Sequence, residues 1–183
     1  MTELTMSLTS TAVVITLNCI LATQVDAASC KLENIPVTPL NPGQYEIFHA
    51  KAKSVELRFN SDANDPEVDV FPEPSLQVLQ LASNTQCEIN SGIWVRKDIY
   101  LSRDEQVLVT HEYSGSNDFL MFYKTAGCSK LHALDVSASR WKITGNTISV
   151  ESMEKQKKGQ QAKQYVLDAS CKPVVKSNKS NQQ

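Results

Sequence analysis

Short runs of alternating apolar and polar side chains recur along the chain, and a period of two is typical of β-strands with one buried face. The clearest run is SVELRFN, in which Val55, Leu57 and Phe59 share one face. The preceding QYEIFHA places Tyr45 and Ile47 on one face and is predicted to be its hairpin partner. This part of the chain is therefore expected to form an antiparallel pair of strands.

The middle of the chain has the densest pattern of this kind. Its three strand candidates are IWVRKDIYLS, QVLVTHEYS and DFLMFYKT. Both faces of the last candidate are apolar, which predicts a central strand covered on two sides. Three further candidates follow in KLHALDVS, RWKITGNTISV and YVLDAS. Within the second of these, Gly145-Asn146 is a two-residue hairpin signal between Ile143 and Ile148.

The segments between these strands are less regular. KLENIPVTPLNPGQY is rich in proline and is expected to be an extended arm or a series of turns. A short strand is expected at Val68–Phe71, and SLQVLQLAS fits either a strand or a turn of helix. Because strand candidates recur at short intervals without a long amphipathic helix, we predict a mainly β, antiparallel fold. It is expected to be a β-sandwich or a partial or small β-propeller, stabilised by disulfides.

The N-terminal residues have a different character. An apolar run from Ala12 to Ala22 is too short to span a bilayer, which takes roughly 20 residues, but has the length of a secretory h-region. Val25-Asp26-Ala27 fits a small-residue cleavage pattern, although the segment before the apolar run lacks Lys and Arg and carries Glu3. We therefore predict a signal peptide over residues 1–27. The alternative is a buried N-terminal element of a cytosolic domain.

Length and charge narrow the classes of function. The 183 residues suffice for a single β domain, predicted over 28–172, followed by a disordered polar tail over 173–183. A formal net charge of −2 gives no general attraction to nucleic acid or to anionic membranes. Neither nucleic acid binding nor a membrane span is expected, and the predicted partner is another protein.

The cysteines indicate an oxidising compartment. Of the five, Cys19 lies in the predicted signal peptide, and the other four are far apart without a C-x-x-C motif, which argues against a zinc site. Four such thiols in an exported protein form two disulfides. Two pairings stay open: one joins Cys30 to Cys171, and the other joins Cys30 to Cys87 and Cys128 to Cys171. A periplasmic or secreted location follows from this interpretation, whereas four reduced cysteines in a cytosolic core are the alternative.

No cofactor or metal is predicted. The glycines are scattered singly and form no phosphate-binding loop. Oxygen-bearing side chains along Asp62–Asp69 suit calcium, but Pro66 stands where a ligand is needed and the glycine of the sharp turn is missing. A solvated turn is the favoured interpretation of this loop, and cation binding is the alternative.

The chain also lacks a recognisable catalytic signature. There is no G-x-S-x-G motif, and the three histidines, His49, His111 and His132, lie on different strand candidates. His111 is in phase with Val107, Val109 and Tyr113, so it is expected to be a half-buried core residue. No catalytic residue is predicted. An envelope hydrolase that uses His111 or His132 as a base is the enzymatic alternative.

A small polar loop is the best candidate for binding. Ser114, Gly115, Ser116, Asn117 and Asp118 lie between two of the strongest strand candidates, directly after Tyr113. Such a tip on rigid strands can enter a partner's cleft at little steric cost. A plain hairpin turn is the alternative. A buried aromatic anchor, for which the candidates are Trp94, Tyr113 and Trp141, would add affinity.

One segment resembles a known structural unit. Asp98–Ser137 is similar to one blade of a β-propeller, with Leu101–Glu105 as its first turn and Leu131–Val136 as its last strand. Glu105 stands where such a turn usually has glycine. A small exported β-protein with this unit and a projecting serine-rich loop resembles, in general plan, the periplasmic immunity proteins. Those proteins neutralise cell-wall amidase toxins of type VI secretion by inserting a loop into the catalytic groove.

This resemblance implies that Ser114, Ser116 and Asn117 are the inserted residues. We therefore predict an exported, non-enzymatic binding protein, an inhibitor or immunity protein whose partner is a secreted cell-wall hydrolase. The two alternatives are the envelope hydrolase mentioned above and a structural or ligand-binding envelope module.

Overall fold

The computed structural model describes residues 30–90, 92–153 and 162–176, and within them all regular structure is β. The strands form three antiparallel sheets. The first sheet contains, in spatial order, β2 (Thr38–Asn41), β3 (Gln44–Lys51), β4 (Val55–Asn60), β6 (Leu76–Gln80) and β7 (Thr85–Ile89). The central sheet contains β1 (Leu32–Asn34), β8 (Ile93–Ser102), β9 (Val107–Ser114), β10 (Asn117–Lys124) and β11 (Lys130–Asp135), with β5 (Val70–Phe71) also paired to β8. The third sheet contains β12 (Ser139–Thr144), β13 (Thr147–Ser152), β14 (Lys163–Leu167) and β15 (Pro173–Val175).

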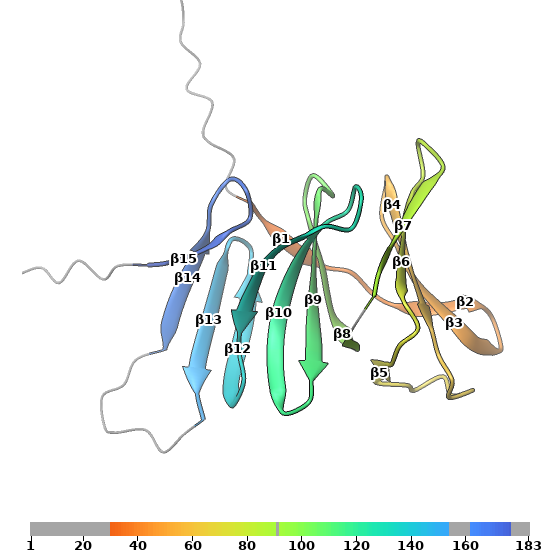
Figure 1. The fold of residues 1–183 in the computed structure, drawn as a ribbon, viewed down its shortest axis with the longest axis horizontal. Coiled ribbons are helices and arrows are strands. Elements are labelled where there is room, and N and C mark those ends of the chain that lie inside the picture. The colour runs from red at the N-terminus through yellow and green to blue at the C-terminus, as the bar shows by residue number, and fades with distance from the viewer. Residues whose placement is uncertain (1–29, 91, 154–161, 177–183) are drawn as a thin grey trace, which may run out of the picture.

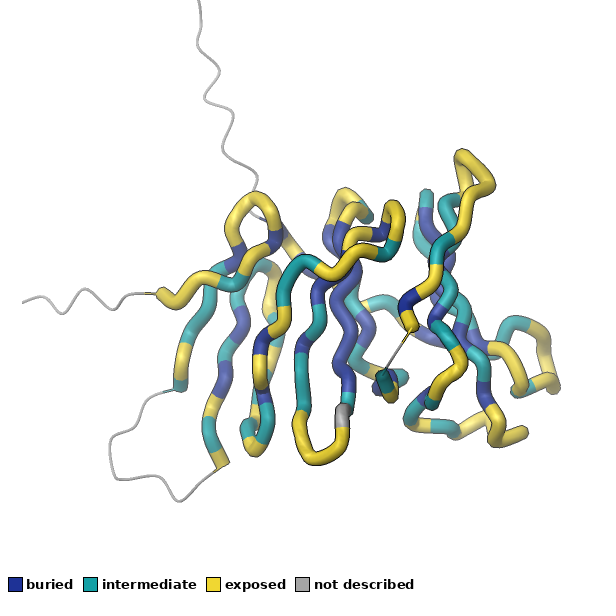
Figure 2. Tube along the Cα trace, viewed as in Figure 1, coloured by how far each residue is buried: buried dark blue, intermediate teal, exposed yellow. Residues whose placement is uncertain are grey.

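The three sheets stand side by side, with the central sheet between the other two (Figure 1). β9 and β10 are therefore covered on both faces, and Figure 2 shows a long buried stretch in β9. Each sheet is largely a meander that packs on its neighbour, as blades of a β-propeller do. This arrangement confirms the predicted antiparallel β fold. It also confirms the blade-like unit, because β8, β9, β10 and β11 pair in sequence order.

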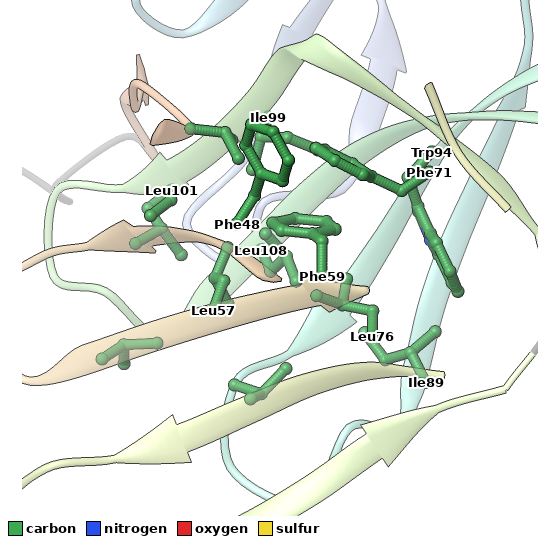
Figure 3. Packing of buried hydrophobic residues seen from close by; sticks show 14 of the residues in the cluster. Phe48, Leu57, Phe59, Phe71, Leu76, Ile89, Trp94, Ile99, Leu101 and Leu108 are labelled. Atoms are coloured by element: carbon green, nitrogen blue, oxygen red, sulfur yellow. The ribbon is translucent and has the colours of Figure 1, made fainter. Parts of the chain in front are cut away.

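The first hydrophobic cluster fills the boundary between the first and central sheets (Figure 3). The first sheet contributes side chains such as Leu57 and Phe59, and the central sheet contributes Trp94 and Leu108. Phe71, from the two-residue strand β5, stacks on the Phe59 ring with 4.8 Å between centroids. This boundary is therefore built largely from large apolar side chains of strands far apart in sequence.

The second hydrophobic cluster lies between the central and third sheets. Val109, Leu120 and Phe122 of β9 and β10 meet Ile148 of β13 and Leu167 of β14. Alternate residues of β10 thus enter different clusters, since its Tyr123 belongs to the first one. Both faces of DFLMFYKT are apolar because one face packs into the first cluster and the other packs into the second.

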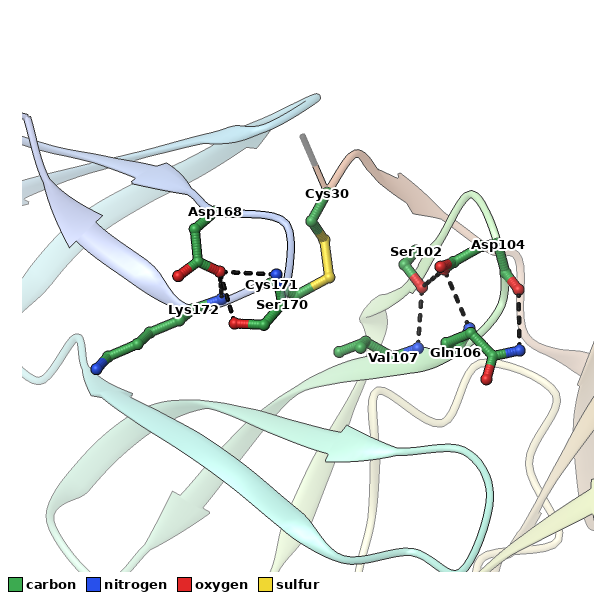
Figure 4. Close-up of a disulfide and its surroundings, with 9 residues drawn as sticks. All are labelled: Cys30, Ser102, Asp104, Gln106, Val107, Asp168, Ser170, Cys171 and Lys172. Carbon is green, nitrogen blue, oxygen red and sulfur yellow. Dashed lines mark hydrogen bonds between the residues drawn. A yellow bond between two sulfur atoms is a disulfide. The ribbon is translucent and has the colours of Figure 1, made fainter. Parts of the chain in front are cut away.

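Each disulfide crosses one of these two boundaries. Cys30–Cys171 joins the segment that leads into β1 to the turn between β14 and β15 (Figure 4). Cys87–Cys128 joins β7, at the edge of the first sheet, to the turn between β10 and β11. Of the two pairings left open by the sequence, the one that joins Cys30 to Cys171 is confirmed, and the one that joins Cys30 to Cys87 is wrong.

A partly buried polar contact also ties the first sheet to the central sheet. Glu105, in the β8–β9 turn, has a φ of +58°, which explains why a blade turn usually has glycine there. Its carboxylate accepts hydrogen bonds from the backbone N–H groups of Lys53 and Ser54 and from the Ser54 hydroxyl. Burial acts to raise the pKa of Glu105, but the hydrogen bonds outweigh it and lower the pKa. The left-handed backbone thus places a carboxylate where it holds the β3–β4 turn.

One expectation needs correction, and two features of the strands were not predicted. The inward face of β3 carries Phe48 and Ala50, whereas Ile47 is exposed, because Phe48 lies opposite Phe59 in the register with β4. The polar tail was predicted to start at residue 173, which is too early, since Pro173–Val175 forms β15 beside β14. The strand β7 was not predicted. The predicted signal peptide lies outside the described residues.

Candidate functional site

The predicted binding loop is the tip of the hairpin formed by β9 and β10. Ser114 pairs with Asn117 and Tyr113 pairs with Asp118, so the turn itself consists of Gly115 and Ser116. Gly115 has a φ of +64°, the left-handed conformation that a tight turn of this kind requires. The tip is therefore smaller than the five-residue loop expected from the sequence, and residues 115–117 are exposed at its end (Figure 2).

The strands behind this tip are held firmly. β9 pairs with β8 on one side and with β10 on the other, and β10 also pairs with β11. The backbone N–H of Asp118 donates a hydrogen bond of 2.9 Å to the Ser137 hydroxyl, and Val136 donates its N–H to the Asp118 carbonyl. A hairpin fixed in this way presents its polar tip with little conformational entropy to lose on binding.

On the side facing the third sheet, His111 lies at the base of the hairpin. Its Nδ1 is 3.0 Å from the Asp98 carboxylate, in the irregular part of β8. Its Nε2 lies 3.9 Å from Asp118. The rings of Tyr113 and Trp141 pack against the imidazole, with centroids 5.0 and 5.1 Å away. The predicted core position of His111 is thus correct, and its neighbours are two carboxylates and two aromatic rings.

This geometry does not suit general-base catalysis. His111 is 6% exposed, and its Nε2 is buried without a hydrogen-bond partner among the described residues. A general base needs to reach the proton that it abstracts, directly or through one water. His132 lies on β11, where its ring faces Phe122 at 6.3 Å. Neither histidine has a hydrogen bond to a serine in the part of the chain that the structure describes.

The other binding candidates have different environments. Trp94 is 1% exposed, so it belongs to the core and is unavailable as a surface anchor. Tyr113 and Trp141 are half-buried. The Asp62–Asp69 loop is held by Arg96, whose guanidinium donates to the carbonyls of Pro66 and Val68. Within residues 30–90, 92–153 and 162–176, no cluster of three acidic, histidine or cysteine side chains has the geometry of a metal site.

On the side facing the first sheet, a cavity opens beside the hairpin, and sequence reasoning missed it. Its volume is about 540 Å³. Its lining combines acidic, basic and apolar side chains, chiefly Glu73, Ile93, Glu112, Phe119, Met121 and Lys130. Tyr113 also borders it, so the cavity adjoins the predicted binding residues directly.

Glu112 is the unusual residue of this cavity. It is 5% exposed, and its carboxylate accepts hydrogen bonds from the Thr110 hydroxyl at 2.5 Å, the Trp94 indole N–H at 3.2 Å and the Tyr123 hydroxyl at 3.2 Å. Gly92 lies against it so closely that a Cβ there would come within 2.9 Å of Glu112 Oε2. Burial raises the pKa of Glu112 above its ordinary value of 4.5, against the opposing effect of these donors and of the Lys130 charge.

Glu112 should therefore make the stability of the protein depend on pH. A folded-state pKa above the unfolded value means that the folded protein binds the proton more tightly. The free energy of unfolding should accordingly fall, relative to Glu112→Gln, as the pH rises from about 4.5 through the raised pKa. Urea denaturation of both proteins across this range measures the difference. A difference that stays constant with pH would contradict the expectation.

Taken together, these features define a class of protein. They are those of a disulfide-linked β protein whose paired strands present a small polar hairpin tip, with a cavity beside it. The model of the immune protein Tsi1 family matches residues 30–180. Immune protein Tsi1 of Pseudomonas aeruginosa strain PAO1 is 31% identical over 158 residues, which cover 85% of this chain and 86% of that protein.

The chain belongs to the immune protein Tsi1 family and is an immunity protein by that membership. The predicted resemblance to immunity proteins is therefore confirmed. The described residues include no helix of sufficient length and apolar character to cross a membrane.

Proposed function

We propose that this protein is an exported immunity protein that blocks a secreted cell-wall hydrolase by inserting the tip of the β9–β10 hairpin into the catalytic groove. It acts by occupying the groove and performs no chemistry of its own. Tyr113, Ser114, Gly115, Ser116, Asn117 and Asp118 form the contact. The observation that carries the proposal is this exposed two-residue turn on strands paired on both sides, in a member of an immunity protein family.

The shape of the hairpin supports insertion. Active-site grooves are concave, and the small residues at positions 115–117 make a narrow end with polar groups for hydrogen bonding. The burial of His111 Nε2 supports the absence of catalysis, because the ring nitrogen is closed to a substrate. The two disulfides support export, since such bonds persist in oxidising compartments.

The proposal is tested by substituting the tip. Ser116→Arg adds a long charged side chain to the narrow end, and we expect binding to weaken by about 30-fold or more, which corresponds to about 2 kcal/mol. The measurement is calorimetric titration with a secreted cell-wall hydrolase that the unaltered protein binds, together with the hydrolysis of cell wall by that enzyme in the presence of each protein. The variant should leave the hydrolase active where the unaltered protein inhibits it.

Ser83→Arg is the matched control. Ser83 lies in the exposed β6–β7 turn, at the opposite end of the molecule from the hairpin tip (Figure 1). The same change of charge and size there should leave affinity and inhibition unaltered. If Ser116→Arg binds as tightly as Ser83→Arg, the hairpin is not the inserted element.

A further inference from the structure

We propose that the cavity beside the hairpin is a second recognition site, which receives a basic side chain, arginine or lysine, with Glu112 as its counter-ion. The site would extend the interface of the proposed function. The inference rests on the proposed function in one respect only: the basic side chain is taken to belong to the hydrolase that the protein blocks. Three independent features of the cavity lead to this assignment: its charge, its lining and its position.

The charge of the cavity favours a cation. Glu73 and Glu112 face it together with a single ammonium group, that of Lys130. Among the described residues, the partners of the Glu112 carboxylate are neutral donors, and no Lys or Arg lies within ion-pair distance of it. A buried carboxylate without a close cation is costly, and a guanidinium or ammonium group that enters the cavity would relieve that cost.

The lining fits the rest of a basic side chain. Ile93, Phe119 and Met121 provide apolar surface between the rim and the carboxylate. Lysine and arginine carry an aliphatic stem behind the charged head, and such stems pack on apolar surface. Gly92, which has a φ of +129°, lies so close to Glu112 that a Cβ there would come within 2.9 Å of Oε2, so a larger residue would press on the carboxylate.

The position connects the cavity to the proposed interface. Tyr113 and Phe119 line it, and they flank the tip of the hairpin on β9 and β10. A partner that surrounds the tip therefore has surface directly over the cavity. A basic side chain at the rim of the partner's groove would enter it while the tip occupies the groove.

The test uses a small probe, so it does not depend on the partner. Nα-acetyl-arginine methylamide is titrated into the intact, oxidised protein, and the amide resonances of Gly92, Glu112, Tyr113 and Lys130 are followed by NMR. We expect saturable shifts in the millimolar range that weaken as the pH falls and Glu112 takes up a proton. The citrulline analogue, which has the same stem and a neutral head, should cause no such shifts.

Two variants make the test specific. Glu112→Gln removes the charge and should abolish the arginine-dependent shifts, whereas Glu46→Gln, on the exposed face of β3, should leave them intact. Ala133→Leu fills the cavity from the exposed side of its lining without altering Glu112, and it should abolish the shifts with the folded spectrum preserved. Equal shifts from arginine and citrulline, or unchanged shifts in Glu112→Gln or Ala133→Leu, would overturn the assignment.

The outcomes also separate this inference from the proposed function. If the probe binds as described but Ser116→Arg still inhibits the hydrolase, the cavity is a binding site for a basic side chain, and the proposal that the hairpin is inserted is wrong. If the probe does not bind while Ser116→Arg abolishes inhibition, the proposal that the hairpin is inserted is retained, and the proposal of a second recognition site is wrong.

Discussion

Replacing Cys30 and Cys171 with serine is expected to lower the free energy of unfolding by about 5 kcal/mol in the chain-entropy model, because the bond closes a loop with a sequence separation of 141. Domains of this size are stable by only about 5–15 kcal/mol. The variant should therefore be partly unfolded at physiological temperature. Chemical denaturation of the purified, oxidised proteins measures the loss.

The position of this disulfide predicts which sheet is destabilised when it is removed. Cys30 and Cys171 belong to the second hydrophobic cluster, and Asp168 lies beside the disulfide (Figure 4). The backbone N–H of Cys30 donates a hydrogen bond to the Asp168 carbonyl. The third sheet should therefore loosen first, with early hydrogen exchange in β14. The double variant of Cys87 and Cys128, whose separation is 41, should lose about 4 kcal/mol and loosen the first sheet instead. Equal exchange patterns in the two variants would contradict this assignment.

Phe71→Ala is expected to cost about 3–5 kcal/mol, the usual range for removal of a buried phenylalanine side chain. Phe71 is fully buried and lies between the rings of Phe48 and Phe59, with centroids 5.2 and 4.8 Å away. Its strand, β5, has only two residues, so the backbone has little other support there. Urea denaturation monitored by Trp94 fluorescence reports the loss, because Trp94 pairs with Phe71 in the register of β5 and β8.

Val70→Ala is the control for the loss of stability expected in Phe71→Ala. Val70 lies on the same short strand but is only half-buried, so its truncation should cost clearly less than that of Phe71. Phe71→Leu should recover most of the stability, because it keeps an apolar side chain of similar volume. A cost for Phe71→Ala no greater than that for Val70→Ala would show that the aromatic contacts contribute little.

Much of the fold follows from local patterns in the sequence. The alternation in SVELRFN and in the middle of the chain predicts β4 and β8 to β11, and Gly145-Asn146 predicts the turn between β12 and β13. These features depend on the period of two and on turn chemistry, which are local properties. The blade-like segment is predictable for the same reason, since its strands pair in sequence order.

The features that were missed depend on contacts between distant segments. Alternation places Glu112 in phase with Leu108 and Thr110, but it does not reveal that the side chains of Trp94 and Tyr123 meet the carboxylate and that it is buried. The inward face of β3 is decided by the pairing of Phe48 with Phe59 across the sheet, which the segment QYEIFHA does not reveal. One signal was present for Glu112: it alternates with His111 but is in phase with the apolar Leu108, on a strand rich in apolar residues on both faces.

The hairpin tip also bears on how such a protein changes over generations. Gly115 is required by its backbone conformation, but Ser116 and Asn117 are exposed and lie outside both hydrophobic clusters. Substitutions there are expected to have little effect on folding. Under the proposed function, a partner with an altered groove can therefore be matched by mutation of a few tip residues, while the sheets that hold the tip stay unchanged.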